Sequence, residues 1–169
     1  MNIGGFEIER KFLIAMPDPG LLEGCEFSDI TQTYLLGEKG TTDRVRCRRR
    51  EGDCEYTHTV KRKISNMRRR EDETVIDAAL YKTLLERADP ARRPIRKRRY
   101  LLPHEGEIWE LDVFPFWTDR AVLELELRDE RQQFEMPPGI RLIREVTDDP
   151  RYTNAALSLS IPEEPAEQS

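Results

Sequence analysis

The 169-residue sequence predicts a mainly β protein, of the α+β type, in which antiparallel strands form a barrel and a few helices flank it. Segments of alternating apolar and polar residues recur along the chain, and turn-forming residues separate them. Only one segment has a strong helical pattern. A single sheet of about seven or eight short antiparallel strands curls or closes, and closure removes its exposed edges. A closed barrel is therefore the expected topology.

The predicted strands share this alternation, and each is bounded by Gly, Pro, Asn or Asp. They cover residues 6–13, 30–36, 44–50, 55–63, 67–76, 95–102, 107–114 and 121–127. The turns between them are expected at 17–20, 40–43, 52–53, 103–106 and 115–119.

The one strong helix prediction covers residues 77–88. Asp77 is a suitable N-cap, and apolar residues follow at helical spacing, at Ala78, Tyr81, Leu84, Leu85 and Ala88. Pro90 and Pro94 end this helix. Shorter helical pieces are expected within 21–26, at 129–134 and at 154–159.

Composition favours one domain, residues 1–162, followed by a disordered tail at 163–169. Charged residues make up 36% of the chain and apolar residues 37%, with a net charge of −5 that argues against a general or sequence-specific nucleic-acid binder. The three cysteines lack metal-ligand spacing, which fits a reduced, cytoplasmic setting. No run approaches the roughly 18 apolar residues of a membrane span, so no membrane partner is expected.

Charge is sorted by sign on individual strand faces, because alternate residues of a strand share a face. Glu7, Glu9 and Lys11 share the first such face. The faces that are mainly basic carry Arg44, Arg46 and Arg48, then Lys61 and Lys63 beside Thr57 and Thr59, then Lys97 and Arg99. Those that are mainly acidic carry Glu71 and Glu73 beside Arg69, then Glu110 and Asp112, then Glu124 and Glu126.

A barrel lined by these faces needs a wet interior that binds something, because desolvating each ion costs several kcal/mol. Clustered carboxylates suit Mg²⁺ or Mn²⁺, and clustered Arg and Lys suit a multiply charged anion such as a phosphate. Metal-bridged polyphosphate satisfies both requirements. The alternative is an amphipathic sheet whose outer faces carry salt bridges.

These residues also match a family pattern along the whole chain. The pattern begins with EIERKFL at residues 7–13 and TQTYL at 31–35, and it continues with RVR at 44–46, Lys61, RREDETVI at 69–76 and KRRY at 97–100. ELDVF at 110–114, ELEL at 124–127 and EVTDDPRYTN at 145–154 complete it. In this order the motifs resemble the CYTH superfamily, the triphosphate tunnel metalloenzymes, and are most similar to its short bacterial members. Residues 118–121 depart from the glycine-containing turn of many members.

The resemblance implies an eight-stranded antiparallel tunnel that binds a triphosphate with divalent metal. It implies one metal held by Glu7, Glu9 and Glu126, and a second held by Asp112, Glu124 and one of Glu71 or Glu73. The phosphate clamp it implies consists of Lys11, Arg44, Arg46, Lys61, Lys97 and Arg99. The family pattern fixes Arg48, Lys63 and Arg69 less tightly.

Inorganic triphosphatase activity is the function expected, with Lys11, Tyr34 and Lys61 as catalytic residues. In the thiamine triphosphatase branch, a tyrosine and a lysine at positions similar to Tyr34 and Lys61 are thought to act as a pair. Tyr34 as an ordinary strand aromatic stays open. Three other functions stay open as well: an adenylate cyclase, a thiamine or nucleoside triphosphatase, and a non-catalytic polyphosphate- or nucleotide-binding module. The partner expected is a small-molecule triphosphate, and a homodimer is compatible with the sequence.

Overall fold

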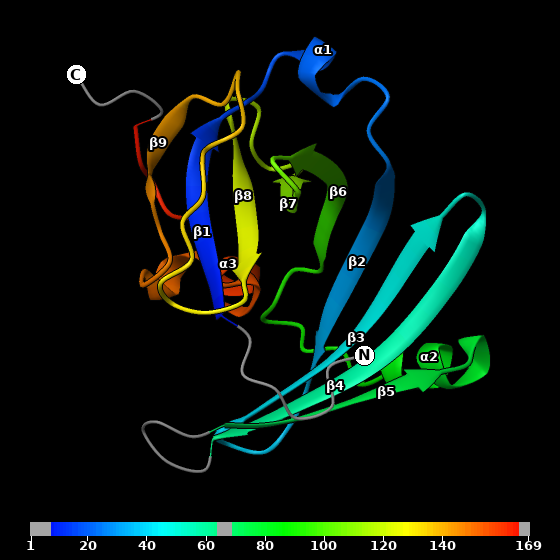
Figure 1. The fold of residues 1–169 in the computed structure, drawn as a ribbon. Helices are drawn as coiled ribbons and strands as arrows, with labels where there is room; N and C mark the ends of the chain where they lie inside the picture. Colours follow the sequence, from blue (N-terminus) through cyan, green and yellow to red (C-terminus); the bar gives the residue numbers. More distant parts are fainter. Residues whose placement is uncertain (1–7, 64–68, 166–169) are drawn as a thin grey trace. The chain divides into compact units, whose positions relative to one another are not determined.

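The structure is a computed structural model that describes residues 8–63 and 69–165 (Figure 1). Its strands are β1 (Ile8–Ala15), β2 (Phe27–Leu35), β3 (Thr41–Arg50), β4 (Asp53–Lys63), β5 (Arg69–Ile76), β6 (Ile95–His104), β7 (Glu107–Val113), β8 (Arg120–Leu127) and β9 (Leu142–Glu145). Its helices are α1 (Pro19–Leu22), α2 (Ala78–Leu85), the short 3₁₀ helix η1 (Pro150–Tyr152) and α3 (Asn154–Leu159). The mainly β prediction is confirmed.

The strands form one nine-stranded sheet in the order β5-β4-β3-β2-β6-β7-β8-β1-β9. The predicted closed barrel of eight strands is wrong in this respect, since the described strands form an open sheet. A ninth strand, absent from the prediction, pairs with β1 at Phe12, Leu13 and Ile14.

The chain divides into two compact units, and the single domain over residues 1–162 stays a prediction. Unit 1 contains residues 1–27, 98–149 and 163–169, and unit 2 contains residues 28–97 and 150–162. The division falls after the first residue of β2 and after the third residue of β6. Most of β6, together with β7, β8, β1 and β9, therefore belongs to unit 1, and β5, β4, β3 and most of β2 belong to unit 2.

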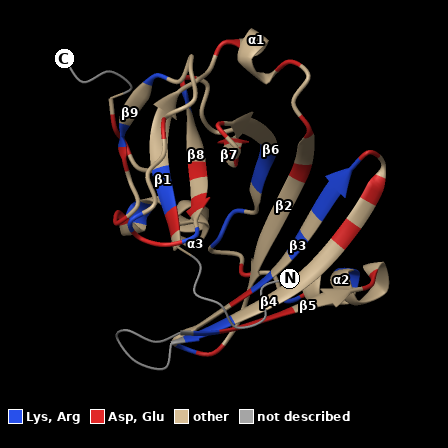
Figure 2. Cartoon of the chain, viewed as in Figure 1, with Lys and Arg blue, Asp and Glu red and all other residues tan. Residues whose placement is uncertain are grey.

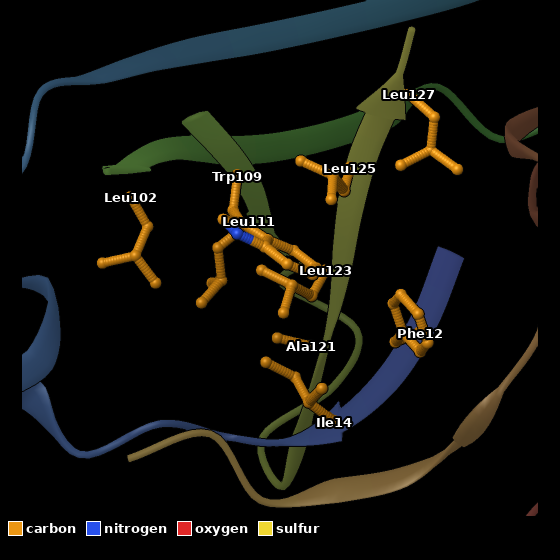
Figure 3. Close-up of a cluster of buried hydrophobic side chains, with 9 residues drawn as sticks. All are labelled: Phe12, Ile14, Leu102, Trp109, Leu111, Ala121, Leu123, Leu125 and Leu127. Atoms are coloured by element: carbon orange, nitrogen blue, oxygen red, sulfur yellow. The ribbon is translucent and has the colours of Figure 1, made fainter. Parts of the chain in front are cut away.

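Unit 1 has its hydrophobic core on one face of its strands (Figure 3). Nine buried side chains from β1, β6, β7 and β8 form this cluster, which consists of Phe12, Ile14, Leu102, Trp109, Leu111, Ala121, Leu123, Leu125 and Leu127. Residues of the loop before β9, including Phe134 and Met136, pack against it. Because strand side chains alternate, the other face of the same strands carries the charged residues.

Unit 2 is built on the β3–β4 hairpin, which has a two-residue loop at Glu51 and Gly52. Both loop residues have positive φ, at 49° and 86°, as a type I′ hairpin turn requires. The β6–β7 hairpin of unit 1 uses Glu105 and Gly106 in the same way, with φ of 49° and 75°.

Of the four helix predictions, those at 77–88 and 154–159 are confirmed, and the one within 21–26 is met only in part, because α1 ends at Leu22. The one at 129–134 is wrong. The Asp77 carboxylate accepts a hydrogen bond of 2.8 Å from the Leu80 N–H and so caps α2 as expected. The final short helix is found at 154–159 as predicted. Residues 129–134 form turns and irregular backbone instead of a helix, and Asp129 accepts a hydrogen bond from the Arg131 N–H there. Among the described helices, none combines the length and the hydrophobicity needed to cross a membrane.

Candidate functional site

Charged residues lie on four neighbouring strands of unit 1, β6, β7, β8 and β1 (Figure 2). Residues that pair across antiparallel strands point to the same side of the sheet. The pairs Glu9–Glu126 and Lys11–Glu124 join β1 to β8, the pair Glu110–Glu124 joins β7 to β8, and the pair Arg99–Asp112 joins β6 to β7. The register therefore places all of these residues on one face, opposite the hydrophobic core.

Two of these cross-strand pairs are carboxylates directly opposite each other. Glu9 lies opposite Glu126, and Glu110 lies opposite Glu124. Like charges in such positions destabilise a sheet unless cations compensate them. Sequence reasoning placed Glu110 on an acidic face but gave it no role, although its alternation with Asp112 was the signal that could have done so.

Arg99 is the centre of this acidic cluster. Its Nε and Nη2 donate to the two oxygens of Asp112 at 2.8 and 2.9 Å. It also pairs with Glu110, and its Nη2 lies 3.9 Å from a Glu124 oxygen. Asp112 is only 1% exposed in its side chain, so this bidentate pair is largely shielded from water.

Lys11 contributes a second internal cation, with its Nζ 3.3 Å from Glu124 Oε1. Burial disfavours the charged form of Arg99, but the hydrogen bonds that it donates to Asp112 and the negative charges of Asp112, Glu110 and Glu124 outweigh this effect and raise the pKa of Arg99. Arg99 thus stays a permanent cation among three carboxylates.

The charged face of unit 2 is set by the register of β2, β3, β4 and β5. One row across the strands reads Tyr34, Arg44, Thr59 and Glu73. The next row, toward the β3–β4 turn, reads Gln32, Arg46, Thr57 and Val75. In the other direction, Thr42 pairs with Lys61, which pairs with Glu71. Basic and hydroxyl side chains predominate here, in contrast to unit 1.

The acidic residues of the unit 2 face have local partners. The Thr59 hydroxyl donates to Glu73 at 3.1 Å, and the Lys61 ammonium lies 3.9 Å from Glu71. Both glutamates are exposed. These contacts do not show which of Glu71 and Glu73 is the metal ligand. That one of them binds metal stays a prediction.

Tyr34 is buried, with 3% of its surface exposed. The Arg92 guanidinium lies 5.3 Å from the ring centre, and it is held by hydrogen bonds of 2.9 Å to Ala155 O and Ser158 Oγ of α3. Burial raises the pKa of the Tyr34 hydroxyl, and the nearby charges of Arg44 and Arg92 offset part of this effect. These contacts support the packing role of Tyr34, and its catalytic role stays a prediction.

Lys97 is buried on β6 within unit 2, with 4% of its surface exposed, and its Nζ lies 3.5 Å from the Asn154 side-chain oxygen. This contact joins two predicted motifs, residues 97–100 and 145–154. The family pattern fixes three further residues, Arg48, Lys63 and Arg69, less tightly. Arg48 forms an ion pair with the exposed Glu55 at 3.4 Å. Lys63 lies opposite Arg69 in the β4–β5 register. Glu7 lies outside the described residues.

Of the predicted metal ligands that the structure describes, unit 1 brings Glu9, Asp112, Glu124 and Glu126 onto one face, while Glu71 and Glu73 belong to unit 2. Lys11 and Arg99, predicted for the clamp, lie among the carboxylates of unit 1. Arg44, Arg46, Lys61 and Lys97 lie in unit 2. The oxygen-only donor set and the two opposed carboxylate pairs of unit 1 fit a hard divalent cation such as Mg²⁺ or Mn²⁺.

Comparison with known proteins gives full-length similarity. The chain is 37% identical to the inorganic triphosphatase of Nitrosomonas europaea over 161 residues, which cover 92% of this chain and 99% of the relative. It is 35% identical to the inorganic triphosphatase of Acetivibrio thermocellus over 156 residues, which cover 90% and 93%. No protein-family model matches the chain.

Solved structures agree with these relatives. A crystal structure of an inorganic triphosphatase is 32% identical, covers 96% of this chain and 100% of its own, and has a TM-score of 0.63. A protein from Pyrococcus horikoshii, 19% identical with a TM-score of 0.50 over 73% of this chain and 80% of its own, shares the fold alone. The chain belongs to the family of these inorganic triphosphatases.

Proposed function

We propose that this protein is a divalent-metal-dependent phosphoanhydride hydrolase that cleaves inorganic triphosphate to diphosphate and phosphate. The observation that carries the proposal is the sorting of charge between two strand faces. One face holds opposed carboxylates that need cations, and the other holds cations and hydroxyls that need an anion. The names of the two relatives support the choice of substrate.

Phosphoryl transfer requires little covalent chemistry from a protein and depends on positioning and charge neutralisation. In this proposal the phosphate oxygens are bound by Arg44, Arg46, Lys61 and Lys97. Each guanidinium group can donate two parallel hydrogen bonds to a phosphate. Lys11 and Arg99 keep the neighbouring carboxylates close together and add positive charge. No nucleophilic side chain is needed, because water is the attacking group.

Glu9 and Glu126 hold one Mg²⁺ or Mn²⁺ in this proposal, with Glu7 as their third partner from the sequence pattern. Asp112 and Glu124 would hold the second, and the sequence pattern adds Glu71 or Glu73 as a further ligand. When bound, a divalent cation would supply charge neutralisation and lower the pKa of a water molecule. The carboxylates of unit 1 would orient the attacking water and accept its proton.

Inorganic triphosphate fits better than a nucleotide because the two charged faces offer mainly ionic and hydroxyl groups. Recognition of adenine needs apolar walls and a few placed hydrogen-bonding groups. Cyclisation also requires a ribose hydroxyl held in line with the α-phosphate.

The proposal has further parts. It includes a charged tunnel, a cytoplasmic location and a small-molecule triphosphate as the partner, and it allows a homodimer.

The test is a comparison of products with purified protein and Mg²⁺ or Mn²⁺. Phosphate release from inorganic triphosphate and from ATP is measured beside cyclic AMP formation, at equal substrate and metal. We expect inorganic triphosphate to be cleaved fastest and activity to disappear with a chelator. Cyclic AMP as the dominant product contradicts the proposal and favours the cyclase. Binding of triphosphate without any turnover favours the non-catalytic binding module.

A further inference from the structure

Thr57 is a buried hydroxyl on the charged face of unit 2. It lies in β4 and pairs with Arg46 of β3 on one side and with Val75 of β5 on the other. Only 4% of its surface is exposed, and its Oγ1 has no hydrogen-bond partner among the described residues. Val75 offers an apolar side chain there, so it cannot supply the missing hydrogen bond.

The neighbouring threonine on the same face, Thr59, has a hydroxyl with a hydrogen-bond partner. Thr59, two residues along β4, is equally buried, and its hydroxyl donates to Glu73 at 3.1 Å. Thr57 lacks such an acceptor because Val75 takes the position that Glu73 has beside Thr59. The difference between the two hydroxyls therefore follows from one residue of β5.

A second donor on the same face is also unsatisfied. The Nε of Arg44 is buried and has no partner among the residues that the structure describes, while its Nη1 donates to Gln32 Oε1 at 3.2 Å. Gln32 belongs to the same cross-strand row as Arg46 and Thr57. Its hydrogen bond with Arg44 therefore connects this row to the neighbouring row that contains Arg44. Gln32 thus holds the Nη1 end of the Arg44 guanidinium, the Tyr34 hydroxyl also interacts with this group, and the Nε hydrogen is left without an acceptor among the described residues.

Two buried donors without acceptors are costly in a folded protein, because each has lost water without gaining a hydrogen bond. Such groups are tolerated where a ligand completes the site. The charge directly opposite Thr57 is Arg46, and Arg44 lies diagonally across the same hairpin. Glu73, the carboxylate on the other side, already accepts from Thr59. The ligand that completes this site is therefore an anion with hydrogen-bond acceptors. Phosphate oxygens have this chemistry.

We propose that the Thr57 hydroxyl and the Arg44 Nε donate hydrogen bonds to oxygens of the bound triphosphate, which makes Thr57 a substrate-binding residue. This inference rests on the proposed function and extends its phosphate clamp by a neutral donor. The inference predicts different effects of removing the hydroxyl on stability and on binding. The free protein loses no hydrogen bond, so its stability should not fall. The complex loses one, so its affinity for triphosphate should fall.

The test uses Thr57→Val, which keeps the shape and removes the hydroxyl, with Thr57→Ser to restore it. Thr57→Ala provides a second removal in case valine disturbs folding. Thr74→Val is the matched control, since Thr74 is exposed in β5 and its register partner, His58, lies on the opposite face of β4. Inorganic tripolyphosphate is the probe, in steady-state kinetics with Mg²⁺ and in thermal unfolding with a chelator present.

We expect Thr57→Val to leave the Tm of the free protein unchanged or raised, and to raise KM for tripolyphosphate about tenfold, the scale of one hydrogen bond to a charged group. Thr57→Ser should restore KM, and Thr74→Val should match wild type. A wild-type KM in both Thr57→Val and Thr57→Ala overturns the inference while the proposed function stands. A lowered Tm of free Thr57→Val with unchanged KM also overturns it. Wild-type protein that neither binds nor cleaves tripolyphosphate overturns the proposed function as well.

Discussion

The two charged faces of this protein differ in how their charges are satisfied. In unit 1, carboxylates from β7 and β8 are neutralised within the fold by Lys11 and, above all, by Arg99, which contacts three of them. In unit 2, the Nε of Arg44 and the hydroxyl of Thr57 are buried without partners among the described residues. Unit 1 carries its compensation inside the chain, whereas unit 2 has donors that an external acceptor can satisfy.

This difference indicates two ways in which a protein tolerates a polar face. Opposed carboxylates repel strongly enough that the free protein needs internal cations to hold them together. Unpartnered donors carry a smaller penalty, which a fold can sustain until a ligand arrives. We therefore expect the loss of a partner of Arg99 in unit 1 to change stability most, and substitutions of the donors of unit 2 to change substrate binding most.

The largest effect is expected from Asp112→Ala. It removes the bidentate partner of Arg99 and leaves a shielded guanidinium undercompensated, which should lower the free energy of unfolding by about 3–5 kcal/mol. Urea denaturation of the metal-free protein measures the change. Glu73→Ala in unit 2 is the control, because that exposed glutamate should cost less than about 1 kcal/mol. Equal losses for the two variants would remove the contrast between the faces.

The next effect is expected from Glu9→Gln. Removing one carboxylate of the Glu9–Glu126 pair relieves repulsion in the metal-free state, so the fold should persist, while metal binding weakens. Turnover of inorganic triphosphate should fall about 100-fold or more at fixed Mg²⁺, since even partners of metal ligands affect activity on that scale. Phosphate release over a range of Mn²⁺ concentrations measures it.

Glu130→Gln is the control for this variant, because Glu130 is an exposed carboxylate in the turn after β8. It should retain wild-type turnover. Substantial activity of Glu9→Gln at ordinary metal concentration would show that Glu9 is not a metal ligand.

A smaller effect is expected from Arg46→Ala on the basic face. Arg46 should contact phosphate in the ground state and the transition state, so KM should rise about tenfold and turnover should slow as well. Arg49→Ala is the control, because Arg49 is exposed and points to the other face of the same strand. An unchanged KM with a collapsed turnover number would assign Arg46 to the transition state alone.

The smallest effect concerns the pH dependence of stability through Tyr34. Burial raises the pKa of this hydroxyl above its ordinary value of 10.0, so the folded state favours the neutral form. The resulting stability is fully present below pH 10 and is lost as the pH rises through the folded-state pKa. Tyr34→Phe cannot ionise there, so its free energy of unfolding should fall less between pH 9 and 12. Parallel curves for the two proteins would mean that Tyr34 ionises as freely in the folded state as in the unfolded chain.

The sequence by itself determined the elements and the face to which each side chain belongs. Alternation in a strand is a local property of the backbone, so Glu124 and Glu126 must share a face wherever β8 lies. The same reasoning placed Arg44 and Arg46 together, and it predicted the Asp77 cap and the helix at 154–159 correctly. Local rules were enough for these features because the residues that decide them are near neighbours in the chain.

The tertiary structure decided which strands pair with each other and which side chains therefore come into contact. The β6–β7 register places Arg99 opposite Asp112, and its guanidinium reaches Glu110 and Glu124, while its role in the phosphate clamp stays a prediction. The pairing of the short strand β9 with β1 was likewise decided by the tertiary structure. These outcomes depend on the register between segments far apart in the sequence, and alternation within one strand carries no information about its neighbour.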